Sequence, residues 1–348
     1  MSITAKELAG ILHMSPAAVS IALNNRPGVS NSTRKMVLEA ADKYGYDFSR
    51  LNKKSNARGP IYYVIYKKHG AVVDKTDFFS ALFEGIEKQT KAEGYKLVVS
   101  TIYENEEMVN RQIEDIQYSD CAGVIVLGTE MAIDDIRKFQ KLPIPFVLLD
   151  TYFEEINCDC VLINNVQGAY QAASHLIKVT GKQPGYLRSS YTIGNFLERN
   201  SGFFKAVRAH GMASGGSAVH YLTPSIEGAY SDMKEIIRSK EKLASAYFVD
   251  NDLIALGAMK ALKEFGYRIP EDIAIVSFDN IPASSIVEPS LSTINVPKTY
   301  MGEVVVKRIV ERINNPKSLP QKIQINTTLI PRRSSDPDII QKERNSIL

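Results

Sequence analysis

The sequence predicts two kinds of structure in one chain: a small α-helical domain at the N-terminus, then an α/β body with two doubly wound parallel sheets. Two observations predict this organisation. Helix-start signals lie close together in residues 1–46, and from Ile61 onward short β-rich runs alternate with amphipathic stretches of helical length. With 348 residues, the chain is long enough for two to three folding units.

The first two helices have well-marked beginnings. Thr4 and Glu7 have the spacing of a capping box, and Ser15 stands as an N-cap before Pro16 at the first helical position. Only a tight turn at residues 13–14 fits between the two helices. Short helices joined this closely cross at a steep angle, which makes a helix-turn-helix, and the second helix has the size that enters a DNA major groove.

A third helix is predicted to begin at Ser30, whose hydroxyl can cap it, and to end before Gly45. The apolar residues of the three helices recur at helical spacing and predict a small common core. The predicted core residues are Leu8, Ala9, Leu12, Val19, Ala22, Leu23, Val37, Leu38 and Ala41.

The outward face of the second helix is predicted to contact DNA. Ala17 and Ile21 can contact only a thymine methyl group, whereas Ser20 and Asn24 can hydrogen-bond a base edge or a phosphate. Residues 1–60 carry nine lysines and arginines against four acids, a net charge of +5, and the rest of the chain carries −2. A basic segment of this kind suits phosphate neutralisation, although a solvated basic terminus is the simpler alternative. The predicted DNA-binding residues are Thr4, Ser15, Pro16, Ala17, Ser20, Ile21, Asn24, Asn25, Arg50, Lys53 and Lys54.

The string AVSIALNNRPGVS at residues 18–30, within a match from residue 2 to about 60, resembles the DNA-binding headpiece of the LacI/GalR family of bacterial transcription regulators. The resemblance continues more weakly to about residue 334. It implies a homodimer that presents two recognition helices to a pseudo-palindromic operator in double-stranded DNA, and a body with the type I periplasmic-binding-protein fold. Many family members carry Arg where this chain has Ile21. We therefore expect this chain to bind DNA but not necessarily the family's usual operator sequence.

Residues 47–60 are polar and basic and end in Gly-Pro, which predicts a linker. The resemblance implies that this segment forms a hinge helix and wedges a leucine into the minor groove. Ser55 or Asn56 stands at that position here and Leu51 lies a turn too early, whereas such a wedge needs an apolar tip. We therefore expect Lys53 and Lys54 to contact phosphates.

Strand–helix–strand repetition in the body predicts parallel sheets covered on both faces. Seven or more such units are too many for a single sheet, so we expect two doubly wound subdomains. The predicted strands are Ile61–Tyr66, Lys96–Thr101, Gly123–Leu127, Pro145–Asp150, Gly185–Arg188, Ala244–Asp250 and Ile273–Phe278. The predicted helices are Phe79–Ala92, Glu107–Tyr118, Val166–Val179, Phe196–His210, Ala229–Ser239, Asp252–Phe265 and Lys298–Ile313.

The resemblance also implies that the chain crosses three times between two subdomains, and we place the crossings near residues 160, 293 and 325. The expected divisions are 1–46 for the headpiece, 47–60 for the linker, 61–334 for the body and 335–348 for the tail. Within the body, the N-subdomain takes 61–160 and 294–324, and the C-subdomain takes 161–293 and 325–334.

Ligands of open α/β sheets bind at the carboxyl ends of the strands, so residues just after strand ends are candidates for a ligand site. Carboxylates and amides can bind vicinal hydroxyls, an arginine supplies a planar fork of donors, and an aromatic ring can cover the apolar face of a sugar. The predicted effector-binding residues, which the resemblance also supports one by one except for Thr129, are Phe78, Phe79, Thr129, Asp150, Arg199, Asn251 and Asp279.

Each of these residues also fits a purely structural role. Asp279 suits a turn, Arg199 an ordinary helix ion pair and Asn251 an N-cap, but their meeting at aligned strand ends favours a site. For a residue from the C-subdomain that stacks on a ligand, Pro224 or Tyr230 falls nearest, and the sequence does not favour either.

Other classes of site lack their signals in this sequence. There is no Gly-x-x-x-x-Gly-Lys-Ser/Thr loop, no Gly-x-Gly-x-x-Gly and no Gly-x-Ser-x-Gly, and the five histidines are scattered. Cys121, Cys158 and Cys160 fit buried reduced thiols better than a metal site. We therefore expect no catalytic residue, no metal and no cofactor.

Location and assembly follow from equally simple features. The apolar runs are too short for a membrane span, and the N-terminus opens into a capped helix instead of a signal peptide, so we expect no membrane partner and a cytoplasmic protein. The tail is too short for a coiled coil, which favours a dimer through the body over a tetramer.

Two functional classes remain. The leading hypothesis is a transcription regulator, a repressor, controlled by a small-molecule effector, a sugar or sugar derivative, between the subdomains. The alternative is a non-catalytic sugar-binding or sensor protein without operator function, and an enzyme that uses the cleft is a third class without motif support. The sequence leaves open the effector, the direction of its control and the operator.

Overall fold

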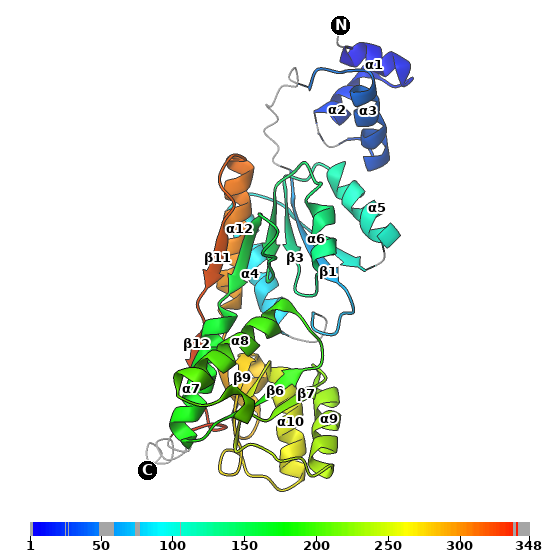
Figure 1. Ribbon diagram of the computed structural model, residues 1–348. Coiled ribbons are helices and arrows are strands. Elements are labelled where there is room, and N and C mark those ends of the chain that lie inside the picture. The colour runs from blue at the N-terminus through cyan, green and yellow to red at the C-terminus, as the bar shows by residue number, and fades with distance from the viewer. Residues whose placement is uncertain are drawn as a thin grey trace.

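The computed structural model describes residues 3–24, 26, 28–48, 59–73, 77–104, 106–336 and 339. Figure 1 shows three bodies in a row: the helical headpiece, the N-subdomain beside it and the C-subdomain at the far end. Four of the predicted DNA-binding residues, Asn25, Arg50, Lys53 and Lys54, lie outside the described residues, as do most of the linker and of the tail.

The headpiece contains the three predicted helices, α1 (Ala5–Ile11), α2 (Pro16–Leu23) and α3 (Asn31–Lys43). Their predicted caps are confirmed: Thr4 and Glu7 form both bonds of a capping box, Ser15 Oγ accepts from the Ala18 amide at 3.1 Å, and Ser30 Oγ accepts from the Thr33 amide at 3.1 Å. Most of the predicted core is buried, whereas Leu12 and Leu38 lie partly buried at its edge.

Arg34 differs from the sequence interpretation, which counts it among the cations available to phosphate. Its side chain is buried, and its guanidinium donates to the carbonyl oxygens of Ala22 at 3.5 Å and Arg26 at 2.8 Å. These carbonyls lie at and just beyond the C-terminus of α2, where backbone acceptors lack helical partners. Arg34 therefore fastens the end of α2 to α3 and is not free to bind DNA.

The N-subdomain is a six-stranded parallel sheet in the order β11-β5-β4-β3-β1-β2. Its strands are β1 (Ile61–Lys67), β2 (Leu97–Tyr103), β3 (Gly123–Leu127), β4 (Phe146–Leu149), β5 (Asp159–Ile163) and β11 (Lys322–Ile325). Its helices are α4 (Phe78–Ala92), α5 (Glu106–Gln117), α6 (Ile133–Phe139) and α12 (Lys298–Asn314).

The C-subdomain repeats this topology in the order β12-β10-β9-β8-β6-β7. Its strands are β6 (Gly185–Ser189), β7 (Val219–Leu222), β8 (Ala246–Val249), β9 (Ala274–Asp279), β10 (Ser292–Asn295) and β12 (Thr328–Ile330). Its helices are α7 (Asn165–Thr180), α8 (Gly194–Ala209), α9 (Ile226–Arg238), α10 (Asp252–Glu264) and α11 (Pro282–Ile286), with a 3₁₀ turn at Ser214–Gly216. The expectation of wholly parallel sheets is wrong at one edge, because β12 runs antiparallel to β10.

Every predicted strand and helix of the body is present, with ends that differ by a few residues. The three crossings lie at residues 164, 296–297 and 326–327. The expected positions near 160 and 293 fall a few residues short, because β5 and β10 continue past them, whereas β11 ends at Ile325, where the third crossing was expected.

Helices α4 and α12 pack with their backbones in close contact. A Cβ atom at Gly85 would lie 2.0 Å from the Thr299 carbonyl oxygen, and one at Gly302 would lie 2.4 Å from that of Leu82. Any larger residue at either position would push the helices apart, because such a contact leaves no room for a side chain. This packing joins α12, which follows the second crossing, to α4.

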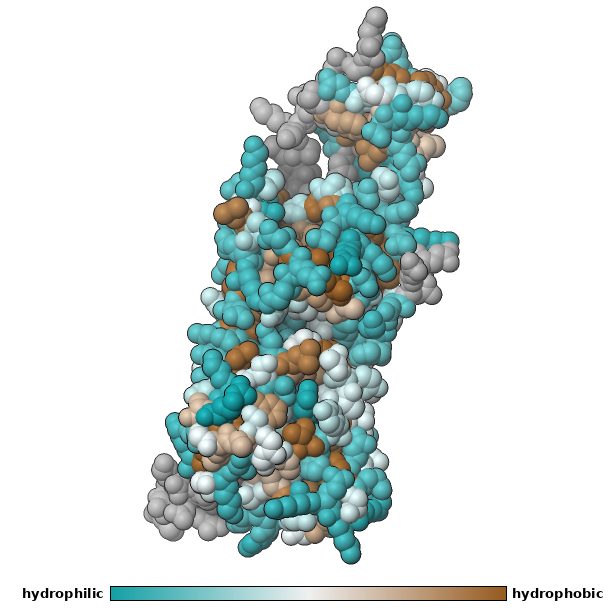
Figure 2. Space-filling model, viewed as in Figure 1, coloured by the Kyte–Doolittle hydropathy of each residue, from teal (hydrophilic) through white to brown (hydrophobic). Residues whose placement is uncertain are grey.

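The surface in view in Figure 2 is largely hydrophilic, with hydrophobic residues scattered over the headpiece and the body. Among the described residues, no helix is both long enough and apolar enough to span a membrane.

Asp159 at the start of β5 lies buried between two arginines of α12. Arg308 Nε lies 2.5 Å from Asp159 Oδ1, and Arg312 Nε lies 3.0 Å from Asp159 Oδ2. Arg308 also donates to the Leu319 carbonyl oxygen at 2.6 Å, and the Gln321 amide donates to Asp159 at 2.9 Å. This buried cluster joins β5, α12 and the segment that leads into β11.

We predict that Arg308→Ala lowers the free energy of unfolding by about 3–5 kcal/mol, because the buried Asp159 carboxylate loses one of its two arginine partners. Arg238→Ala is the matched control: Arg238 pairs with Glu235 on the surface at 2.8 Å, and its loss is expected to change stability by less than about 1 kcal/mol. Urea unfolding followed by circular dichroism measures both. Equal losses in the two variants would show that the buried cluster contributes nothing special.

Candidate functional site

The carboxyl ends of the strands of both sheets face one another at the boundary between the subdomains. In each sheet the strand order reverses between two neighbours, β1 and β3 in one and β6 and β8 in the other. Such a switch point opens a crevice beyond the strand ends, where ligands of α/β sheets bind. Both crevices open onto the same space.

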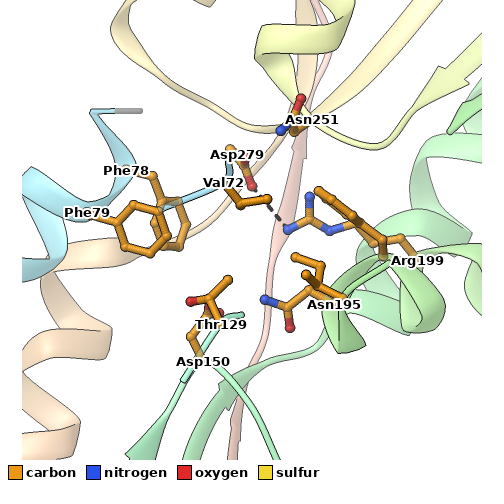
Figure 3. Close-up of a pocket in the computed structure, with 11 residues that line it drawn as sticks. Val72, Phe78, Phe79, Thr129, Asp150, Asn195, Arg199, Asn251 and Asp279 are labelled. Carbon is orange, nitrogen blue, oxygen red and sulfur yellow. Dashed lines mark hydrogen bonds and ion pairs between the residues drawn. The ribbon is translucent and has the colours of Figure 1, made fainter. Parts of the chain in front are cut away.

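All seven predicted effector-binding residues line one cavity in this space (Figure 3). Phe78 and Phe79 come from the start of α4, Thr129 and Asp150 follow β3 and β4, Arg199 comes from α8, Asn251 follows β8 and Asp279 ends β9. The sequence missed four further lining residues, Val72, Ile193, Asn195 and Phe196.

The guanidinium of Arg199 is buried at the centre of the C-subdomain wall. Its Nε donates to Asn165 Oδ1 at 2.9 Å, its Nη1 donates to the carbonyl oxygen of Asp250, and its Nη2 lies 3.2 Å from Asp279 Oδ1. Its flat face lies 3.8 Å from the ring centre of Phe278. All three nitrogens therefore already have protein partners, so the ion-pair alternative for Arg199 holds alongside its place in the cavity.

Asp150 forms the opposing wall. Thr129 Oγ1 donates to Asp150 Oδ2 at 2.7 Å, while Asp150 Oδ1 is buried without a hydrogen-bond partner among the described residues. Burial raises the pKa of Asp150 to about 6, against the lowering effects of the Thr129 hydrogen bond, the charge of Arg199 and the Asn195 amide. This leaves an acceptor oxygen open to a ligand.

Both aspartates that line the cavity have strained backbones. Asp150 has φ 65° and Asp279 has φ 108°, both in the left-handed region that non-glycine residues seldom adopt. Conformations of this kind persist where the surrounding structure holds them, and they gather at functional sites. Here the strain lies at the ends of β4 and β9, where the strand turns its carboxylate toward the cavity.

Asn251 also keeps the structural role weighed above, since its Oδ1 accepts from the Ile254 amide at 2.9 Å as the N-cap of α10. The aromatic residue from the C-subdomain is Phe196, not Pro224 or Tyr230. Tyr230 instead bonds to Glu264 and Lys234 across α9 and α10. Phe196 directly follows Asn195 at the start of α8. Inspecting the first turn of that helix, and not only the strand ends, would have found both residues in the sequence.

Glu130 supports the cavity from behind. Its buried carboxylate accepts five backbone N–H bonds at 2.9–3.2 Å from residues 68–70, 72 and 73, and these bonds hold its pKa low despite burial. The fixed loop places Val72 on the cavity wall. It also places His69 against Tyr191 of the C-subdomain, with ring centres 4.8 Å apart, so the loop spans the boundary between the subdomains.

The cavity encloses about 20 Å³, room for little more than one water molecule. A ligand the size of a sugar therefore enters only if the two subdomains move apart. The three crossing segments are the connections about which such a movement can turn.

The second candidate surface is α2 of the headpiece. Ser15, Pro16 and Ala17 are exposed, whereas Ser20, Ile21 and Asn24 are half-buried. Asn24 Nδ2 donates to the Ser20 carbonyl oxygen at 2.9 Å. Part of the hydrogen-bonding capacity of the Asn24 amide is therefore already used within the helix.

Two other contacts bear on this surface. Ile21 packs beside Gly28, and Thr4 is engaged in its capping box. The headpiece contacts the body through α3, where Lys35 Nζ lies 2.5 Å from Glu114 Oε2 of α5.

A metal site has no support in the described part of the chain, where no three histidine, cysteine, aspartate or glutamate side chains are grouped to hold an ion.

Comparison with known proteins agrees with this architecture. A family model described as a periplasmic binding protein-like domain matches residues 173–335. The transcriptional repressor PurR of Mannheimia succiniciproducens is 27% identical over 95% of this chain and 98% of its own length, and the regulator GalR of Escherichia coli is 27% identical over 95% of each. The solved structure of the regulator CelR with cellobiose superposes with a TM-score of 0.72 at 23% identity, over 95% of this chain and 99% of that one.

The headpiece, the paired sheets and these similarities over 95% of the chain support its resemblance to the LacI/GalR family of transcription regulators.

Proposed function

We propose that this chain is a repressor that binds a DNA operator through α2 and releases or tightens its hold when a small polyhydroxylated effector occupies the cavity between the subdomains. The observation that carries the proposal is the exposed N-terminal end of α2 in a capped helix-turn-helix. A recognition helix contacts base edges with its N-terminal residues. Pro16 and Ala17 stand in that position.

The effector half of the proposal rests on the donors and acceptors that surround the cavity. The lining residues offer carboxylates, amides and a hydroxyl beside three phenylalanines, the mixture that a sugar needs. The relative with bound cellobiose supports the same class of ligand. An alternative is a sugar sensor without an operator, which the full-length similarity to named repressors and regulators makes the weaker candidate.

Lys298 provides a physical path for control. It begins α12 of the N-subdomain, yet its Nζ donates to the carbonyl oxygens of Asp279 and Asn280 in the C-subdomain, at 2.5 and 3.1 Å. A ligand that shifts Asp279 therefore acts on α12, and α12 packs on α4. Control requires that the effector bind the DNA-competent and DNA-incompetent arrangements with different affinities.

We further propose that the chain acts as a cytoplasmic homodimer without catalytic activity. A two-fold dimer presents two copies of α2 to a pseudo-palindromic site, as operator geometry demands. The relatives are named as regulators, in keeping with a non-catalytic cavity.

The direct test is selection of bound duplexes from a random library by the full-length protein, at several salt concentrations. We expect a pseudo-palindromic sequence to be enriched, with an affinity that falls as salt rises because phosphate contacts release counterions. Equal binding of selected and random duplexes at every salt concentration would refute the repressor proposal.

Ala17→Glu is predicted to weaken binding to the selected operator by about tenfold or more, because it places a carboxylate against the DNA. The exposed first turn of α2 tolerates glutamate, so folding should be unchanged. Ala209→Glu makes the same change on the exposed surface of α8 and is the control. Fluorescence anisotropy measures both affinities, and an unchanged affinity in Ala17→Glu argues against this face.

Effector affinity is predicted to rise as the pH passes through about 6 and to level off about one unit above it. Burial raises the pKa of Asp150 to about 6, the charge of Arg199 lowers it and that of Asp279 raises it, and a hydroxyl donor binds the ionised carboxylate best. Protonation below that pH therefore competes with the ligand. Calorimetric titration from pH 5 to pH 8 measures the effect, and Asp150→Asn should remove it. A profile that stays the same in the variant assigns the titration to another group.

A further inference from the structure

We propose that the cavity selects a sugar that carries no acidic group, and that it accepts a neutral or amine-bearing sugar in preference to a sugar phosphate. This inference rests on the proposed effector function and narrows its ligand class. It starts from the charges on the cavity wall and from which of them are already engaged.

The lining residues include two carboxylates and one guanidinium. Asp150 and Asp279 are both nearly buried, and Arg199 is the only cation among the described lining residues. The wall therefore carries a net charge of −1 when both aspartates are ionised. An anionic ligand would have to approach this charge between buried walls, where like charges repel more strongly than in bulk water.

The guanidinium of Arg199 cannot serve a phosphate without giving up existing partners. It is 4% exposed, and its three nitrogens are held by Asn165, the Asp250 carbonyl and Asp279. Lys298, the next cation, is likewise engaged by three backbone carbonyl oxygens at 2.5–3.5 Å. A phosphate normally needs an arginine fork or a lysine that is free to turn toward it.

Asp150 places a buried acceptor on the wall of the cavity, which the amides of Asn195 and Asn251 also line. Asp150 is 3% exposed, and its Oδ1 has no hydrogen-bond partner among the described residues. A buried carboxylate oxygen gains most from a hydroxyl or ammonium donor. The Asp150 carboxylate therefore favours a ligand that offers a hydrogen-bond donor, and a phosphate group that has lost its protons at neutral pH offers none.

One feature favours an anion, namely the first turn of α8. Its N-cap residue, Ile193, offers no side-chain bond, so amide donors at Asn195 and Phe196 are free of a cap. A helix N-terminus acts as roughly half a positive charge. That is smaller than the net charge of the wall, so the local sum stays negative and the selection against anions stands.

The test uses three matched sets of probes with the full-length protein: glucose, galactose and mannose, each as the neutral sugar, the 2-amino sugar and the 6-phosphate. Thermal unfolding shifts identify the sugar skeleton that binds, and calorimetry then ranks the three forms. We expect the amino and neutral forms to bind and the 6-phosphate to bind at least about tenfold more weakly. A 6-phosphate that binds as well as its neutral partner overturns the inference, and so does the absence of any shift across all nine compounds.

Asp150→Asn tests the assigned group. The change removes the charge and keeps an oxygen for Thr129, so the ratio of amino-sugar to sugar-phosphate affinity should fall about tenfold or more. Asp134→Asn is the control, since Asp134 lies exposed on α6 beside Arg137. An unchanged ratio in Asp150→Asn overturns the role of Asp150. Duplex selection with the same preparations reports DNA binding separately, so failure of the ligand ranking leaves the repressor proposal standing.

Discussion

The buried guanidinium of Arg199 is the interaction on which the ligand end of this molecule depends. Strand ends of the C-subdomain bury the side chains of Asp250 and Asp279, and burial raises the pKa of Asp250 to about 6. Buried carboxylates need a compensating positive charge, and arginine is the side chain that stays protonated at any physiological pH. Because Arg199 also bonds to Asn165 of α7, the same group orients α8 against the sheet and holds the cavity wall in shape.

The features that the sequence predicted correctly in the headpiece are local. Thr4, Ser15 and Ser30 act within their own helix starts, so three or four neighbouring residues contain all the information that each cap requires. Arg34 shows the limit of that reasoning. A lysine or arginine on a short basic helix is usually solvated, and only the approach of α2 from elsewhere in the chain turns this one inward. Charge counted along a sequence therefore overstates the charge available to DNA.

In the body, the cavity residues were predictable because parallel strands deliver their carboxyl ends to one edge, whatever the details of packing. Elements of three to five residues, such as β7, β10 and β12, were missed because such short runs carry too little periodicity to stand out from loops. The antiparallel direction of β12 follows from a return across the subdomain boundary, which no local pattern records. Glu130 was missed as a loop anchor for a related reason: its partners are backbone amides, which every sequence contains.

The three crossings described above also govern how the protein can be made. The sheet of the N-subdomain includes β11, which the ribosome delivers after every strand of the C-subdomain except β12. Neither half is a continuous piece of polypeptide, so the first half cannot finish folding while the second is still inside the exit tunnel. One edge of β5 stays unpaired until β11 has been synthesised, well over a hundred residues later. An unpaired strand edge promotes aggregation, so the chain is a candidate for chaperone binding during this period.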